Sequence, residues 1–189
     1  MMKHEVYITP NEVKVDGKVL AHNEKGAALL AELYRAHVGD YPKFFKMDTL
    51  SKLGFVASEL LLQAEGAPRF EPREDCAVIF FNRSASLQAD TAYQATIQDP
   101  DNFFPSPAAF VYTLPNIVTG EIAIRNKYFG ETSFIVLPEL DPQIMAQQLQ
   151  LAFLDPMTTS VLGGWLDCTD ENHFEAELYI IFKTKSLNL

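Results

Sequence analysis

The sequence predicts an α/β domain in which a mixed, mostly parallel sheet of about five strands lies between helices and is closed by an antiparallel hairpin. Two short apolar runs, "CAVIFF" and "TSFIVL", are typical of buried strands and alternate with segments of helical periodicity. Two further apolar runs, "TTSVLGGWLDC" and "HFEAELYIIFK", are joined by the short polar link "TDEN", which predicts the hairpin. No repeat or long linker divides the chain, so residues 1–189 are expected to form a single domain.

The first residues predict a strand, a hairpin and a helix. The β-branched run "VYIT", residues 6–9, favours a strand. Asp16 followed by Gly17 is a common hairpin turn between alternating segments. The stretch "NEKGAALLAELYRAHVG", residues 23–39, places its leucines at helical spacing and ends in glycine, so it predicts a helix.

Residues 47–66, "MDTLSKLGFVASELLLQAEG", predict a largely buried helix, because their apolar stripe covers much of the helix surface. Asp48 is the expected N-cap and Gly66 the expected stop. After the strand "CAVIFF", residues 87–97 predict a modest helix. The proline-rich residues 99–110 predict a loop.

The rest of the chain alternates helix and strand before the closing hairpin. Residues 116–130, "NIVTGEIAIRNKYFG", predict a helix capped by Asn116. After the strand "TSFIVL", Asp141 and Pro142 begin a further helix in the usual order of cap and proline. That helix, residues 142–154, is expected to be buried on several sides. Its inward-facing residues are expected to be Ile144, Met145, Leu149, Ala152 and Phe153.

Composition narrows the classes of function. The net charge of −10 disfavours nucleic acid as a partner, because its phosphates would be repelled. No apolar run of about 18 residues predicts a membrane span, and "MMKHEVYITP" lacks a signal-peptide core, so a cytoplasmic protein without membrane contact is expected. Cys76 and Cys168 offer neither a disulfide framework nor a metal-ligand spacing, and no metal or cofactor is expected.

Several segments together resemble the N-terminal half of β-ketoacyl synthases, enzymes of the thiolase fold. The resemblance starts at "VYIT" and continues in "FFKMDTLSKLGFVASELLL" and "CAVIFFNRSAS". Its most specific part, "SPAAFVYTLPNIVTGEIAIRNKYFG", is similar to the family's segment that leads through an asparagine, here Asn116, to a helix with a small-residue face. The resemblance covers essentially the whole chain and implies a thiolase-like half-domain.

The resemblance also implies where a catalytic site would lie. Family members carry a cysteine at the turn after the third core strand, where a helix N-terminus lowers the thiol pKa and the thiolate accepts an acyl group. In this sequence the cysteine is absent and the turn places Glu139 near that position. A carboxylate cannot replace a thiolate in thioester exchange, since the resulting anhydride would be more reactive than the thioester. Glu139 is therefore either a carboxylate in an acyl pocket, whose pKa burial would raise, or a helix-entry residue stabilised by the helix dipole, which we favour.

Other reactive side chains favour structural roles. The family's two catalytic histidines lie in its C-terminal half, and surface or capping roles are expected for the histidines of this chain. These are His4, His22, His37 and His173. Cys76 and Cys168 are expected to be buried structural thiols. Ser84 and Ser86 lack the surroundings of a nucleophile elbow, so turn roles are favoured for them.

Two more patterns favour structure over chemistry. Gly163 and Gly164 lie inside a predicted strand, where they indicate a bulge or close packing. Asp167, Asp170 and Glu171 are close in sequence, but their spacing fits no known calcium loop and a solvated turn is expected. No residue is assigned as catalytic or as a metal ligand. The residues that the resemblance offers as substrate-binding candidates are Ser84, Phe110, Asn116 and Glu139.

The leading hypothesis is a non-catalytic, ketosynthase-like partner subunit in fatty-acid, polyketide or aryl-polyene-type biosynthesis. It rests on the resemblance, because chain-length-factor-type subunits also lack the cysteine, pair with a catalytic subunit and shape its tunnel. One alternative is an acyl-thioester-binding, decarboxylating or hydrolytic enzyme that uses Glu139 or Ser84, an activity related to the acyltransferases. Another is a stand-alone module that binds a small ligand.

The sequence also predicts that the protein is not a monomer. An apolar strand at a sheet edge invites pairing, so we expect a homodimer through Thr132 to Leu137, or a heteromer with a ketosynthase subunit. The resemblance further implies an apolar surface that lacks a cover, because the family packs its N-terminal half against a C-terminal twin. Binding to acidic acyl carrier protein is expected to be weak or absent at a net charge of −10, with Lys43, Lys46 and Lys52 as a local attraction.

Overall fold

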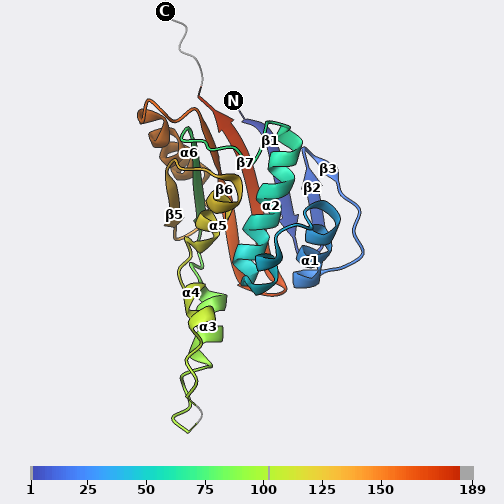
Figure 1. Cartoon of the computed structure of the whole chain (residues 1–189), viewed down its shortest axis with the longest axis vertical. Coiled ribbons are helices and arrows are strands. Elements are labelled where there is room, and N and C mark those ends of the chain that lie inside the picture. Colours follow the sequence, from blue (N-terminus) through green and yellow to red (C-terminus); the bar gives the residue numbers. More distant parts are fainter. Residues whose placement is uncertain (1, 102, 184–189) are drawn as a thin grey trace, which may run out of the picture.

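The structure is a computed structural model that describes residues 2–101 and 103–183 (Figure 1). Within these residues one seven-stranded sheet has the strand order β3-β2-β1-β7-β6-β4-β5. The strands are β1 Met2–Thr9, β2 Glu12–Val15, β3 Lys18–Val19, β4 Cys76–Asn82, β5 Thr132–Val136, β6 Ser160–Asp170 and β7 His173–Phe182. The predicted α/β class, with its mixed sheet and closing hairpin, is confirmed.

The sheet differs in two ways from the mostly parallel, roughly five-stranded one that the sequence predicts. Only β4 pairs in parallel, with β5 on one side and β6 on the other. The remaining pairings are antiparallel, because both hairpins join the same sheet and meet at β1 and β7. Alternation of strands and helices in the sequence says nothing about which strands become neighbours, and this is why the parallel share was overestimated.

Helices cover the two sides of the sheet unequally (Figure 1). On one side α2 Thr49–Glu65 lies across the sheet between α1 Gly26–His37 and α5 Ile117–Asn126. The short helix η1 Pro42–Lys46 joins α1 to α2. On the other side α6 Pro142–Leu151 continues into η2 Ala152–Leu154. The main core lies under α2, whose residues are buried over most of its length, as the sequence predicts.

Close packing explains three glycines. A Cβ on Gly54 of α2 would lie 2.6 Å from Val118 Cγ2 and 2.7 Å from Leu166 Cδ2, so a larger residue would push α2 away from α5 and β6. A Cβ on Gly163 would lie 2.8 Å from the Ile79 carbonyl oxygen, and one on Gly164 2.0 Å from that of Glu177. The expected close packing at the paired glycines is therefore observed.

The smaller core lies between β4, β6 and α6 and corrects the prediction that this helix is buried on several sides. Met145 and Leu149 are buried in it, as is Ala152 just beyond, while Phe153 is only partly buried. Ile144 is 39% exposed. One side of α6 packs on the sheet and the other faces solvent, so periodicity identified the inner stripe and overstated its width.

The ends of the elements follow their cap residues in most places. Asp48 accepts a hydrogen bond from the Ser51 N–H, and Asp141 accepts one from the Ile144 N–H at 3.0 Å. Gly66 ends α2 in the left-handed conformation at φ +72°. Asn116 stands at the N-cap of α5 but its side chain makes no capping bond. Two predicted helices, over residues 87–97 and 116–130, are shorter than expected.

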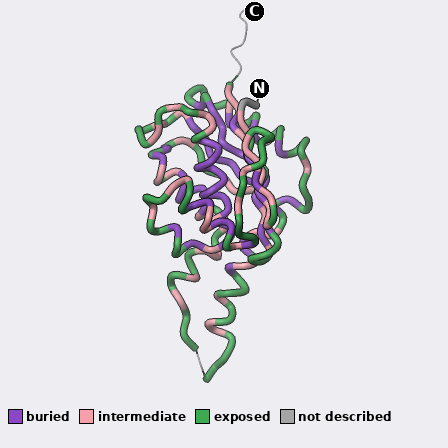
Figure 2. Tube along the Cα trace, turned by 90° about the vertical axis from the view of Figure 1, so that its right-hand side faces the viewer, coloured by how far each residue is buried: buried purple, intermediate pink, exposed green. Residues whose placement is uncertain are grey.

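Residues 83–101 and 103–116 form an arm that projects from one end of the sheet (Figures 1 and 2). It contains α3 Leu87–Gln94 and α4 Pro107–Val111. The second helix corrects the prediction of an uninterrupted loop over residues 99–110, because Ser106 and Pro107 start a helix in the order of cap and proline. The arm exposes large apolar side chains, namely Leu87, Phe103, Phe104, Phe110, Val111 and Leu114.

Candidate functional site

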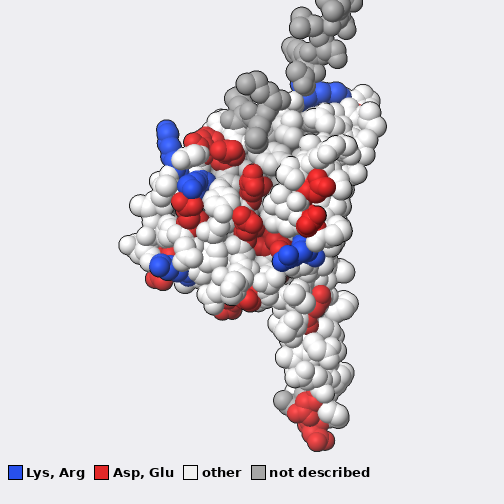
Figure 3. All heavy atoms as spheres, turned by 180° about the vertical axis from the view of Figure 1, so that it is seen from behind, with Lys and Arg blue, Asp and Glu red and all other residues white. Residues whose placement is uncertain are grey.

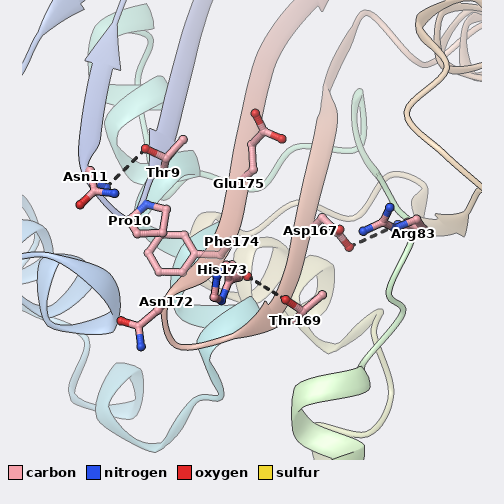
Figure 4. Close-up of a pocket in the computed structure, with 10 residues that line it drawn as sticks. All are labelled: Thr9, Pro10, Asn11, Arg83, Asp167, Thr169, Asn172, His173, Phe174 and Glu175. Atoms are coloured by element: carbon pink, nitrogen blue, oxygen red, sulfur yellow. Dashed lines mark hydrogen bonds between the residues drawn. The ribbon is translucent and has the colours of Figure 1, made fainter.

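A polar cavity of about 480 Å³ lies at the hairpin end of the sheet, on the side that carries α6 (Figure 4). The turn after β1, residues 9–11, forms one wall. The β6–β7 hairpin forms the floor, and Arg83, which follows β4, lies on the other side. Asp167 of β6 and Glu175 of β7 are directly opposite each other across the antiparallel ladder, so both carboxylates face this cavity.

The turn from β4 into the arm is fixed beside this cavity. The Asp167 carboxylate accepts hydrogen bonds from the backbone N–H groups of Arg83 and Ser84, at 3.3 and 3.0 Å, and from the Ser84 hydroxyl at 3.3 Å. The side chain of the buried Asn82 donates to the carbonyl of Ala85 and accepts from its N–H. Ala85 adopts φ +47°, an uncommon conformation that these contacts hold in place.

Ser84 is therefore a turn residue whose hydroxyl donates to a carboxylate. A nucleophilic serine needs a base that accepts its proton, usually a histidine. In the part of the chain that the structure describes, no histidine is hydrogen-bonded to Ser84. His173 also lines the cavity, but its Nδ1 lies 2.8 Å from the Asp170 carboxylate at the tip of the hairpin. The hydrogen bond from the backbone N–H of Asn172, and then this pairing with His173, hold the pKa of Asp170 below its usual range.

Glu139 is exposed in the loop between β5 and α6. The helix N-terminus is capped instead by Asp141, whose carboxylate accepts from the N–H groups of Gln143 and Ile144. The exposed position of Glu139 matches a helix-entry residue better than a carboxylate buried in an acyl pocket.

The other substrate-binding candidates lie elsewhere. Phe110 is 52% exposed on the arm, and Asn116 is exposed at the start of α5. Of the four candidates, Ser84 alone adjoins the polar cavity, through Asp167. The structure therefore does not gather Ser84, Phe110, Asn116 and Glu139 into one lining.

Both cysteines are buried free thiols, as the sequence predicts. Burial raises the pKa of the Cys76 thiol, and it raises the pKa of Cys168 to about 12, with smaller contributions from nearby carboxylates. A thiol with so high a pKa holds its proton at neutral pH and is a poor nucleophile.

A second cavity, of about 290 Å³, lies where the arm meets the N-terminus of α2. Alanines of α3 and α4 line it together with Tyr112, Lys46 and Asp48. The sequence predicted a local basic patch of Lys43, Lys46 and Lys52 in this region. Lys43 forms an ion pair with Glu121 at 2.5 Å. The expected local basic patch is therefore partly neutralised within the chain itself.

Sequence reasoning missed the polar cavity because its walls come from distant segments. A signal was nevertheless present in β7, where Glu175 and Glu177 alternate with Ala176 and Leu178. This period of two indicates a strand with one polar face. The sequence grouped Asp167, Asp170 and Glu171 as one solvated turn. In the structure Asp167 instead lies within β6 and lines the cavity, whereas Glu171 is exposed in the turn.

No helix among the described residues is long and apolar enough to cross a membrane. Comparison with protein-family models and with curated proteins finds no match. Comparison with solved structures finds matches. "The ishigamide ketosynthase/chain length factor" matches with a TM-score of 0.68 and 16% identity, over 99% of this chain and 63% of that chain. "Ketosynthase (ApeO) in Complex with its Chain Length Factor (ApeC) from Xenorhabdus doucetiae" matches with a TM-score of 0.64 and 14% identity, over 98% of this chain and 79% of that chain.

The likeness extends over nearly all of this chain, while the chain spans less than two thirds of the ishigamide protein it matches. At such low identity a structural match establishes architecture and leaves function open. The chain has the α/β fold found in ketosynthase/chain length factor structures.

Proposed function

We propose that this chain is a non-catalytic, chain-length-factor-like partner subunit of a ketosynthase, in fatty-acid, polyketide or aryl-polyene-type biosynthesis. The observation that carries the proposal is the open edge of β5 beside the projecting apolar arm. The fold supports the proposal, since the matched structures are named as ketosynthase/chain length factor proteins. In this role the chain needs no cysteine at the Glu139 turn, because the ketosynthase partner supplies the catalytic thiol.

The edge of β5 is available for pairing with another chain. β5 is the last strand of the sheet and is half-exposed, which corrects the prediction of a strand buried on both faces. The N–H of Leu137 donates to Asn82, and the carbonyl of Glu131 accepts from Val78. Hydrogen bonds in a parallel pair alternate along the strand, so the N–H groups of Thr132, Phe134 and Val136 point away from β4. An unpaired row of this kind is a template for a further strand.

Exposed apolar side chains extend from this edge. Val136 is 50% exposed on β5, and Ile124 and Phe129, on and just after α5, are 68% and 69% exposed. The arm, which carries further exposed aromatic residues, projects from the sheet below β5 and α5 in the view of Figure 1. Apolar surface of this extent is uncommon on a soluble monomer and is typical of an interface.

The proposal is tested by co-expression with the ketosynthase encoded nearest to this chain. Size-exclusion chromatography with light scattering should give a heteromer, in which Thr132 to Leu137 pairs with the partner. The chain alone should form a homodimer through the same strand, at about twice its mass of 21.2 kDa. Val136→Pro removes one outward N–H and should abolish both species, because proline cannot donate to a ladder.

Val136→Thr keeps the N–H and the branched side chain and is the matched control. It should associate as the unchanged chain does. A chain that stays monomeric alone and does not bind the ketosynthase would contradict the proposal. So would a heteromer that Val136→Pro leaves intact, since its interface would then lie elsewhere.

The alternative of an acyl-thioester enzyme receives less support, because Glu139 is exposed and the Ser84 hydroxyl donates to Asp167. Release of carbon dioxide or free thiol from a malonyl or acyl thioester by the chain alone would favour it. For acyl carrier protein we propose weak or absent direct binding. A dissociation constant at or below about 1 μM at physiological salt would contradict that.

A further inference from the structure

One face of the sheet is left open on the side that carries α6. α6 packs on β4 and β6, while β1, β2 and the hairpin end of β7 have no helix above them on this side (Figure 1). Val6, Ile8 and Leu178 point into the main core, so their neighbours in sequence point to the open side. We call this surface the open face. It consists of the side chains of Glu5, Tyr7, Thr9, Glu12, Lys14, Asp167, Glu175, Glu177 and Tyr179.

The open face is acidic and not apolar, unlike the exposed surface of the arm and of β5. Carboxylates gather across it (Figure 3). Lys14 pairs with Glu12 at 2.8 Å. Among the residues whose side chains the structure describes, Glu5, Glu175 and Glu177 have no basic side chain within ion-pair distance. A surface of this kind does not fit an apolar cover.

The register places like charges next to each other. Asp167 is directly opposite Glu175, and Glu177 is the next residue on the same face of β7. Like charges in directly opposite positions destabilise a sheet. Burial raises the pKa of Glu177, and the charges of Glu175 and Glu5 raise it further. Three hydrogen bonds from Arg83 and Ser84 stabilise the Asp167 carboxylate, and Tyr7 interacts with Glu175, but among the described residues no basic side chain forms an ion pair with Glu175 or Glu177.

We propose that the open face is a docking surface for a basic segment of a protein partner, whose Lys or Arg side chains lie over Glu5, Glu175 and Glu177. The polar cavity at its lower end receives one of these side chains between Asp167 and Glu175. Charge complementarity carries the assignment, because a cationic segment replaces the repulsion with attraction along two adjacent strands.

Other features of the face select a polypeptide over a simple cation. No group of His, Cys, Asp and Glu among the described residues is placed to hold a metal ion. The half-buried rings of Tyr7 and Tyr179 lie among the carboxylates. Lys14 Nζ of the chain already lies 5.7 Å from the centre of the Tyr7 ring, and Tyr179 offers a similar surface to the alkyl stem and charge of a Lys or Arg of the segment. Nucleic acid and anionic membranes are repelled by the same charge.

This surface is separate from the β5 edge, which lies at the far end of the strand order from β1 and β2. The docking proposal can therefore be tested without the proposed ketosynthase partner. The probe is a fluorescein-labelled peptide with four repeats of Lys-Ala-Arg-Ala, titrated with the full chain in about 150 mM salt while anisotropy is measured. A peptide with Glu in place of Lys and Arg is the probe control.

We expect saturable binding of the basic peptide and none of the acidic one. Glu175→Gln with Glu177→Gln should raise the dissociation constant by at least about fivefold, since two ion pairs are lost. Glu24→Gln with Glu71→Gln removes the same charge from exposed loops outside the sheet. This control pair should change the dissociation constant by less than about 1.5-fold. Amide shift changes on peptide addition should map to β1 and β7.

Two results would overturn the proposal. Equal weakening in both double variants would mean that the peptide senses only the net charge of the chain. Absence of saturable binding would mean that the open face takes no basic segment. Thermal unfolding of Glu175→Gln with Glu177→Gln guards against a folding artefact, and its midpoint should match or exceed that of the unchanged chain because repulsion is removed.

Discussion

The carboxylate of Asp167 accepts hydrogen bonds from both the backbone N–H and the hydroxyl of Ser84, at 3.0 and 3.3 Å. This contact joins the root of the arm to the central strand β6. It also explains why the serine after β4 is a structural residue, since its proton is already directed at a carboxylate. The arm therefore leaves the sheet in a defined direction.

Removing this carboxylate should loosen the root of the arm. Asp167→Ala should lower the free energy of unfolding by about 2 kcal/mol, because two N–H groups and a hydroxyl lose a charged acceptor. Ser84→Ala loses only the hydroxyl bond and should cost about 1 kcal/mol. Urea denaturation measures both. Glu171→Ala in the exposed turn is the control, and an equal effect of all three would show that the contact has no energetic role.

The apolar side chains of the arm should matter for association and not for folding. Phe104 is 73% and Leu114 50% exposed, so replacing both with Ser should change the free energy of unfolding by less than about 0.5 kcal/mol. If the arm contacts a ketosynthase partner, the same change should abolish the heteromer in light scattering. Val19 is 66% exposed on β3, at the opposite edge of the sheet. Val19→Ser should leave the heteromer intact.

Neither cysteine should accept an acyl group. Cys76 and Cys168 are buried, and burial raises both pKa values, so little thiolate exists at neutral pH. Mass spectrometry after incubation with an acyl thioester should show the unmodified chain. Iodoacetamide should label both thiols only after unfolding in urea. Stoichiometric acylation of either cysteine in the native protein would overturn the non-catalytic interpretation.

The contribution of Asp48 to the free energy of unfolding depends on pH with a sign opposite to that of most capping carboxylates. Burial raises its pKa above the ordinary value of 3.8, so the folded chain holds this proton more tightly than the unfolded chain. Its contribution to stability is present below pH 3.8 and is lost as the pH rises through the raised value. Asp48→Asn keeps a capping oxygen without this titration, so its stability relative to the unchanged chain should grow between pH 3 and 7.

Asp48→Ala is the matched comparison, because it loses the hydrogen bond from the Ser51 N–H. It should be about 1 kcal/mol less stable than Asp48→Asn across that range. Thermal unfolding at several pH values separates the two effects. Identical pH profiles for the unchanged chain and Asp48→Asn would show that the titration of this carboxyl does not contribute.

Glu59 of α2 should be among the most sensitive polar positions. Its side chain is 2% exposed, forms an ion pair with Arg69 and lies 3.6 Å from Arg125 Nε. Glu59→Gln leaves Arg69 with an uncompensated charge, while Arg125 keeps its ion pair with Asp40, so the change should cost about 3 kcal/mol. Glu71→Gln, on an exposed loop, should cost less than about 0.5 kcal/mol. Equal midpoints in urea would contradict the prediction.

Local signals in the sequence determined the elements and many of their ends. Asp48 and Asp141 cap helices because a side-chain oxygen reaches the first free N–H groups, and this depends on neighbouring residues alone. Gly66 ends α2 because the left-handed backbone conformation at a helix C-terminus favours glycine. The strand Cys76–Asn82 and the closing hairpin follow from the apolar run and the turn in the same way. These interactions span a few residues, so the sequence carries them directly.

Tertiary structure alone decided which strands pair and what each face meets. Ser84 and Asp167 are 83 residues apart, and they meet because β4 and β6 are neighbours, which depends on how all the apolar faces are buried together. The exposure of Glu139 and of one side of α6 has the same origin. Periodicity shows that a helix has an apolar stripe, but only the assembled sheet shows how much of the stripe is covered. The acidic open face likewise became visible only once β1 and β7 were paired.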